Sequence, residues 1–62
     1  MTHDEKLKMF YAMKTYGGSF VRALADCFLY ADENNLKKLE IAFPLEVKQY
    51  SEMAKNEGKQ NE

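Results

Sequence analysis

The stretch "SFVRALADCFLY" at residues 19–30 is apolar around most of a helical circumference. At about 100° per residue, its polar residues Ser19, Arg22 and Asp26 lie on one narrow stripe, and its other residues are all apolar. A helix of this composition has to be covered by protein on more than one side. We therefore expect it to be the central helix of the fold, with Arg22 and Asp26 paired along the polar stripe.

The chain has only 62 residues with which to cover this helix. A domain of about 60 residues buries only about 60% of the surface that its unfolded chain exposes, so its core is marginal. Cys27 is the only cysteine and His3 the only histidine, which excludes an internal disulfide and a thiolate or imidazole metal cluster. We therefore expect no metal or other cofactor, and we expect the chain to self-associate, as a dimer or larger assembly, or to bind another protein.

The hydrophobic pattern predicts an all-α fold. Apolar residues recur three and four positions apart along most of the chain, β-branched residues are few, and the only proline lies between two helical patterns. The prediction is a small bundle of three to four short helices around a mostly apolar central helix. Residues 1–55 form the single domain, and residues 56–62, which contain no apolar side chain, form a disordered polar tail.

The ends of the first helix carry local signals. Thr2 followed by Glu5 is the pattern of a capping box, in which each side chain accepts a hydrogen bond from the other residue's backbone N–H. The helix is expected to run from about His3 to Thr15. Gly17 is expected to end it in the left-handed backbone conformation.

The third and fourth helices are marked by Asp32 and Pro44. Asp32 is a favourable N-cap, and a proline forces the third helix to end before it while suiting the first position of the fourth. Helical spacing then predicts two inward-facing stripes, one on each helix: Leu36, Leu39 and Phe43 on the third, and Val47, Tyr50, Met53 and Ala54 on the fourth.

Ile41 and Leu45 lie off these stripes, on either side of Pro44. Single exposed apolar residues are common on folded proteins, and that remains one interpretation. The other is that Ile41 and Leu45 belong to an interaction patch. Met9 and Met13 of the first helix are assigned to the same patch, because methionines among aromatic residues are typical of adaptable interfaces, although they are also common in small cores.

The "GGS" sequence before the second helix is a candidate anion site. Gly17, Gly18 and Ser19 would present backbone N–H groups at the positive end of the helix dipole, with Arg22 one turn further on. A phosphate-binding loop has more glycines at fixed spacing and follows a strand, which this segment does not. The alternative is that Gly17 ends the first helix and Gly18 permits a tight turn.

No catalytic residue is predicted. His3 lies near the N-terminus, and Cys27 lies in an apolar run without a basic neighbour that would activate its thiol. We expect Cys27 to be a buried structural residue. The acidic residues are spread over outward faces, without the recessed pair that acid–base catalysis requires. The sequence therefore predicts a protein that is not an enzyme.

The charge of the chain bears on its partners and its location. A formal net charge of −1 gives no field that would attract nucleic acid. The second and third helices could nevertheless imitate a helix-turn-helix, with Lys37 and Lys38 as its contacts to the nucleic-acid backbone. The first ten residues lack the pattern of a signal peptide, and no apolar run approaches the roughly 20 residues that span a bilayer. The expected location is the cytoplasm, with no membrane partner.

The run from Tyr16 to Tyr50 resembles a short protein that recurs in phages and prophages. The likeness is carried by "YGGSFVRAL", the "AD" before an asparagine-containing helix start, "AFP" and the tyrosine of "KQY". Members of that group often carry an aromatic residue soon after the proline, where this chain has "LEV". The resemblance implies a small accessory protein of a mobile element that binds a host factor.

These observations favour a non-enzymatic accessory protein that acts by protein–protein interaction. Two alternatives stay open. One is a small helix-turn-helix-like nucleic-acid-binding protein, and the other is a sponge that holds an anionic small ligand at the "GGS" turn.

Overall fold

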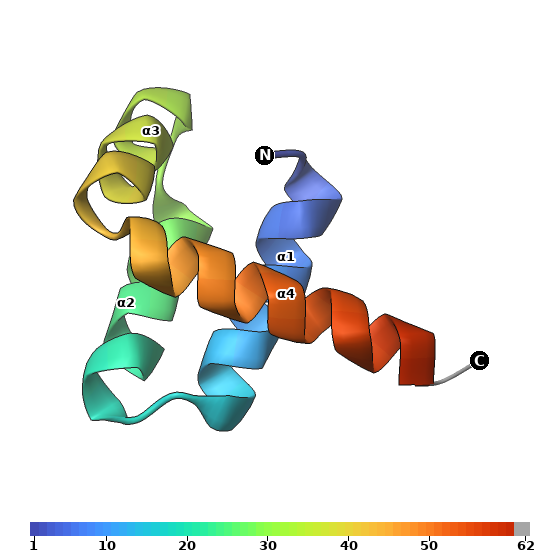
Figure 1. Cartoon of the computed structure of the whole chain (residues 1–62). Helices are drawn as coiled ribbons and strands as arrows, with labels where there is room; N and C mark the ends of the chain where they lie inside the picture. The colour runs from blue at the N-terminus through green and yellow to red at the C-terminus, as the bar shows by residue number, and fades with distance from the viewer. Residues whose placement is uncertain (61–62) are drawn as a thin grey trace.

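The computed structural model describes the backbone of residues 1–60 and the side chains of residues 1–56. This part of the chain forms helices α1 (His3–Tyr16), α2 (Ser19–Tyr30), α3 (Glu33–Ala42) and α4 (Pro44–Gln60), without any strand (Figure 1). The prediction of a small all-α bundle is confirmed.

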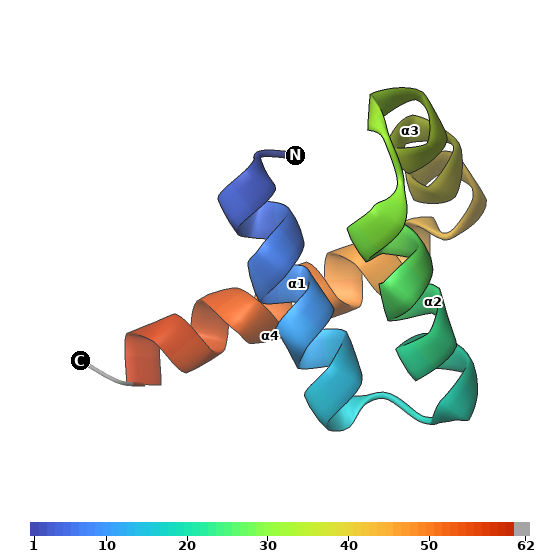
Figure 2. The ribbon, with the colours of Figure 1, turned by 180° about the vertical axis from the view of Figure 1, so that it is seen from behind.

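The helices form a compact domain in which α1 packs against both α2 and α4. In Figures 1 and 2, α1 and α2 lie side by side and run in opposite directions, α4 runs across α1, and α3 stands beyond the end of α2. The radius of gyration of 11.0 Å is close to the value of about 10.6 Å expected for a folded chain of this length.

The helix starts have the caps that the sequence predicts. Thr2 N–H donates to Glu5 Oε1 at 2.7 Å and Glu5 N–H donates to Thr2 Oγ1 at 3.1 Å, which completes the capping box of α1. The hydrogen bond from the Thr2 backbone holds the pKa of the Glu5 carboxyl below its usual value. At the start of α3, Asn35 N–H donates to Asp32 Oδ1 at 2.8 Å. These local signals were sufficient to place the helix starts.

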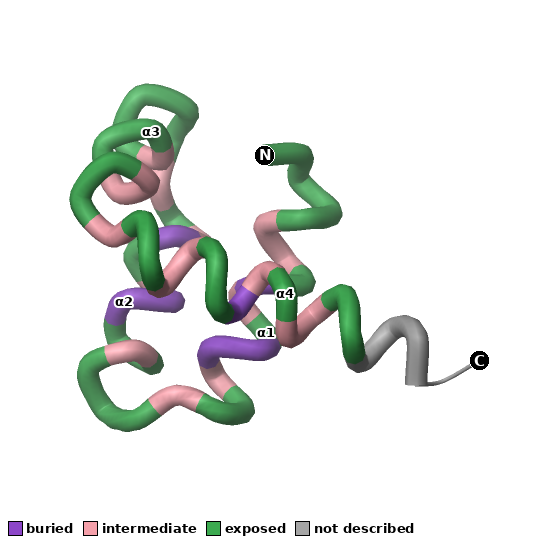
Figure 3. The backbone as a smooth tube through the Cα atoms, viewed as in Figure 1, coloured by how far each residue is buried: buried purple, intermediate pink, exposed green. Residues whose placement is uncertain are grey.

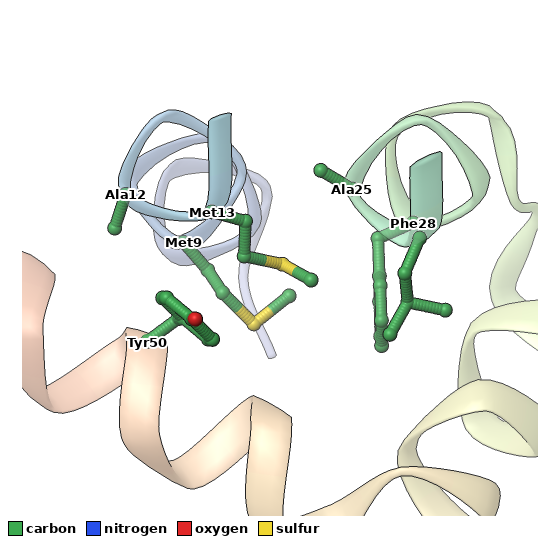
Figure 4. Close-up of a cluster of buried hydrophobic side chains, with 7 residues drawn as sticks. Met9, Ala12, Met13, Ala25, Phe28 and Tyr50 are labelled. Atoms are coloured by element: carbon green, nitrogen blue, oxygen red, sulfur yellow. The ribbon is translucent and has the colours of Figure 1, made fainter. Parts of the chain in front are cut away.

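The core lies where α1, α2 and α4 meet (Figure 3). In Figure 4 the side chains of Met9 and Met13 extend from α1 toward Phe28 of α2, and Tyr50 approaches from α4. The buried apolar residues of the described chain are Met9, Ala12, Met13, Leu24, Ala25, Phe28 and Tyr50. Helix α3 has no buried residue and contributes only half-buried side chains, which are the predicted stripe of Leu36 and Leu39 together with Phe43 beyond its last turn.

The expectation that residues 19–30 form the central helix needs correction. It is α1 that packs substantially against two neighbours, and part of the apolar circumference of α2 faces solvent, including Cys27 and Phe20. The reason is that α1 buries its methionines on a narrow face that reaches both α2 and α4. The hydrophobicity of one segment does not determine which segment lies in the middle.

The polar residues between α1 and α2 also pair differently from the expectation. Asp26 lies 3.2 Å from Lys14 Nζ, so it forms its ion pair with α1 and not with Arg22, which is exposed. Lys6 Nζ donates to the Leu29 carbonyl oxygen at 3.3 Å, near the end of α2. Both lysines therefore join α1 to α2, which local spacing within α2 could not indicate.

Gly17 ends α1 by a different mechanism from the predicted one. Its φ of −81° and ψ of 156° are extended, and its N–H donates to the Met13 carbonyl oxygen at 2.9 Å. A Cβ at this position would lie 2.6 Å from that oxygen and would overlap the side chain of Val21. The glycine is needed because the start of α2 approaches it closely, and no left-handed conformation is involved.

Helix α4 continues to Gln60, through residues 56–60 of the segment that was predicted to be a disordered tail. The segment lacks apolar residues, but it has no helix-breaking residue before Gly58, and extending a formed helix costs much less than starting one. Residues 61 and 62, which the prediction also assigned to the tail, lie outside the described residues.

The two glycines give a matched test of this packing. Gly17→Ala should lower the free energy of unfolding by about 1–3 kcal/mol, because the new methyl group meets the Met13 carbonyl and Val21. Gly18→Ala should change it by less than about 0.5 kcal/mol, because no atom lies within 4 Å of a Cβ built there. Urea unfolding followed by circular dichroism measures both, and equal effects would contradict the proposed close approach.

Candidate interaction surface

Two large aliphatic side chains protrude at the turn between α3 and α4. Ile41 is 80% exposed and Leu45 is 76% exposed, as expected from their positions off the inward stripes. Phe43, the C-cap of α3, lies between them in the chain and is half-buried. Each aliphatic residue is two positions from Phe43, so their Cα atoms lie within about 7.6 Å of its Cα.

Phe20 extends this group of apolar side chains to a third helix. Its ring centroid lies 5.9 Å from that of Phe43, with the two planes tilted by 58°, so the first turn of α2 reaches the α3–α4 turn. Phe20 is nevertheless 60% exposed. We refer to Phe20, Ile41, Phe43 and Leu45 as the turn patch.

Phe20 was missed at the sequence level because it was assigned to the interior with the rest of α2. One signal could have distinguished it: Phe20 lies in the first turn, where a helix has fewer neighbours than at its middle. Its contact with Phe43 joins residues more than twenty positions apart, which no local pattern reports.

Charged residues of both signs surround the α3–α4 turn, and exposed Glu33 and Glu52 lie four residues from Lys37 and Lys48. Between residues 34 and 49 the exposed charged residues are Lys37, Lys38 and Lys48. The carboxylates of this range, on Glu40 and Glu46, belong to half-buried residues.

Met9 and Met13 do not belong to the exposed patch to which they were assigned. Both are fully buried, at 0% exposure, within the core. Methionines among aromatic residues are compatible with an interface and with a core. Here α1 packs between α2 and α4, and both methionines therefore belong to the core.

The residues of the candidate anion site lie together at the start of α2. Gly18 is the N-cap without a side-chain hydrogen bond, and Ser19 and Arg22 are exposed. Gly17 is half-buried and is explained by its close approach to Val21. The anion site stays a prediction.

Cys27 is exposed, which corrects the expectation of a buried thiol. It lies at a shallow, open depression of about 340 Å³ between α2 and α3, lined by Cys27, Tyr30, Ala31, Asn35, Lys38 and Leu39. The periodic pattern of α2 was misleading here, because α3 packs too loosely to cover this side of it. Among the described residues, no group of three or more His, Cys, Asp or Glu side chains is placed to hold a metal ion.

Comparison with protein families, curated proteins and solved structures found no match for this chain. The resemblance to a phage protein therefore stays a prediction. Over the described residues, the helices are too short or too polar to cross a bilayer.

Substitutions of the adjacent residues Cys27 and Phe28 test the observed packing against the predicted one. Cys27→Ser should change the free energy of unfolding by less than about 0.5 kcal/mol, because the thiol is exposed. Phe28→Ala should cost about 3–5 kcal/mol, which is comparable to the whole stability of so small a domain. Chemical denaturation measures both effects, and rapid labelling of the native thiol by a disulfide reagent provides an independent check. A protected thiol, or a large loss of stability in Cys27→Ser, would contradict the exposure of Cys27.

Proposed function

We propose that this chain is a small, non-enzymatic accessory protein that acts by binding another protein through the turn patch. The supporting observation is the exposure of Ile41 and Leu45 beside the Phe20–Phe43 contact. Large apolar side chains gathered from several helices are a common feature of interaction sites. The proposal assigns no catalytic residue.

The number and size of the protruding side chains indicate how strong such binding can be. Fully burying a side chain of this size contributes about 1.5–3 kcal/mol. Association costs an estimated 4–15 kcal/mol in lost motional freedom, so three protruding side chains alone support only weak or transient binding. A protein partner would have to add polar contacts around the patch.

The proposal also includes the origin and location inferred from the sequence, namely a phage- or prophage-encoded protein in the host cytoplasm. The exposed Cys27 supports this location, because an unpaired surface thiol persists best in a reducing compartment. Self-association stays a prediction and is one of the possible uses of the same patch.

Charge introduced into the turn patch tests the proposal. Ile41→Glu and Leu45→Glu should each abolish binding to the partners that the unmodified chain retains, and should shift any self-associated species toward monomer. Because both positions are exposed, folding should be preserved, with stability changes within about 0.5 kcal/mol. Light scattering gives the solution mass, and immobilised chains exposed to host lysate give the retained proteins.

Asn56→Glu is the matched control for these variants. It adds the same charge at an exposed position of α4, eleven residues beyond Leu45, and it should leave mass and retained proteins unchanged. If Ile41→Glu and Leu45→Glu behave like this control, the turn patch is not the binding surface.

A further inference from the structure

One face of α2 is apolar and exposed along the whole helix. Phe20 near its start is 60% exposed, Tyr30 at its end is 83% exposed, and Ala23 and Cys27 between them are exposed as well. At about 100° per residue, these four residues lie within a sector of about 80° around the helix axis. We refer to them as the α2 stripe, which the core formed by α1, α2 and α4 leaves uncovered.

The α2 stripe is symmetric about its middle. Phe20 and Tyr30 lie five positions on either side of Ala25, and Ala23 and Cys27 lie two positions on either side of it. In a two-fold contact between identical chains, residue i of one copy contacts residue j of the other, and j contacts i. An antiparallel pair of α2 helices centred at the level of residue 25 therefore places Phe20 opposite Tyr30. The same arrangement places Ala23 opposite Cys27.

We propose that two copies of this chain associate through the α2 stripe as an antiparallel, two-fold dimer. The small side chains of Ala23 and Cys27 meet at the centre, where they let the two helix axes approach closely. Aromatic rings meet at both ends, and contacts between such rings are favourable beyond the area that they bury. The inference goes beyond the proposed function, because the stripe contains neither Ile41 nor Leu45.

The depression between α2 and α3 adjoins the stripe. Its volume is about 340 Å³, and Cys27 and Tyr30 line it together with Leu39 of α3. Because Phe20 of the second copy lies opposite Tyr30, its ring reaches this depression. Lys38 also lines the depression, and the two Lys38 side chains of a dimer lie at opposite ends of the contact. The second copy thus buries apolar surface that α3 leaves open.

The charges beside the stripe are complementary in the same arrangement. Arg22 is exposed, and the side chain of Asp26 stays 50% exposed although it pairs with Lys14. Arg22 and Asp26 border the same edge of the stripe, and in an antiparallel pair this edge meets its equivalent on the other copy. Arg22 of one copy then lies about 3 Å along the axis from Asp26 of the other. A carboxylate has acceptor sites for both Lys14 and Arg22, so each dimer gains two Arg–Asp pairs.

This symmetry favours a second copy over any other occupant. A helix of an unrelated protein, or a small ligand in the depression, requires no matched spacing on either side of residue 25. Neither requires an acid and a base on the same edge of the stripe. Two aromatic rings per copy give a contact at the small end of specific interfaces. The dimer is therefore weak, and its fraction rises with protein concentration.

One added cysteine tests the register of the dimer. Ala23→Cys places a thiol opposite the native Cys27 in both halves of the contact, so oxidised glutathione should convert this variant into a disulfide-linked dimer. A bridge within one helix is disfavoured, because Cβ atoms four residues apart are separated by about 5–6 Å and a disulfide needs about 3.5–4.5 Å. Non-reducing electrophoresis and mass spectrometry of the linked peptides measure the product.

Two chains with one thiol on the stripe are the matched controls. They are the unmodified chain and the combination of Ala23→Cys with Cys27→Ser. In the proposed register, the equivalent thiols of a dimer are offset by four residues, or about 6 Å along the axis, in addition to the separation of the helix axes. A disulfide does not reach over this distance, so both controls should cross-link at least about tenfold more slowly than Ala23→Cys.

A charge on the stripe provides a second test. Ala23→Glu should lower the association constant at least about tenfold, because it places a carboxylate within an apolar contact. Asn56→Glu adds the same charge at an exposed position outside the stripe and should leave the association constant unchanged. Sedimentation equilibrium over a range of protein concentrations measures both.

Two results would overturn the inference. One is cross-linking of Ala23→Cys no faster than that of the controls, whether or not the chain dimerises. The other is dissociation of a dimer by Ile41→Glu with no effect of Ala23→Glu, which would place self-association at the turn patch. Binding of another protein to the turn patch is measured separately, by the proteins retained from lysate, so the two proposals can fail independently.

Discussion

The packing of α1 between α2 and α4 is the contact on which the rest of the structure depends. Met9 and Met13 lie fully buried between α2 and α4, two helices that are far apart in the sequence. Phe28 of α2 lies on one side and Tyr50 of α4 on the other. Methionine suits this position because its flexible, unbranched side chain fills irregular space between two differently inclined neighbours. The close approach at Gly17 belongs to the same contact, since it sets how near the start of α2 comes to the end of α1.

The position of α3 follows from how little core remains after these three helices have packed. Helix α3 has no buried residue, and with the C-cap Phe43 it is held through half-buried side chains on one face. Its opposite face, with Lys37, Lys38 and Ile41, is therefore left to solvent. Of the turn patch, Ile41 thus lies on the helix that contributes least to the core.

Half of the candidate interaction surface could be predicted from the sequence. Ile41 and Leu45 depart from the stripes of their own helices, and helical periodicity reports such departures directly. Met9, Met13 and Cys27 were misassigned because periodicity gives the face of a residue and does not say what lies opposite that face. Phe20 joins the surface through its ring contact with Phe43, which links distant parts of the chain.

The sequence by itself determined the all-α class, the capping of α1 and α3, and the division between α3 and α4 at Pro44. These features depend on hydrogen bonds and backbone preferences that act within a few residues. Only the tertiary structure decided that α1 has two large neighbours, that Asp26 pairs with Lys14, and that Cys27 faces solvent. Those outcomes depend on how whole helices pack against one another, because a side chain is buried only when another segment of the chain packs over it.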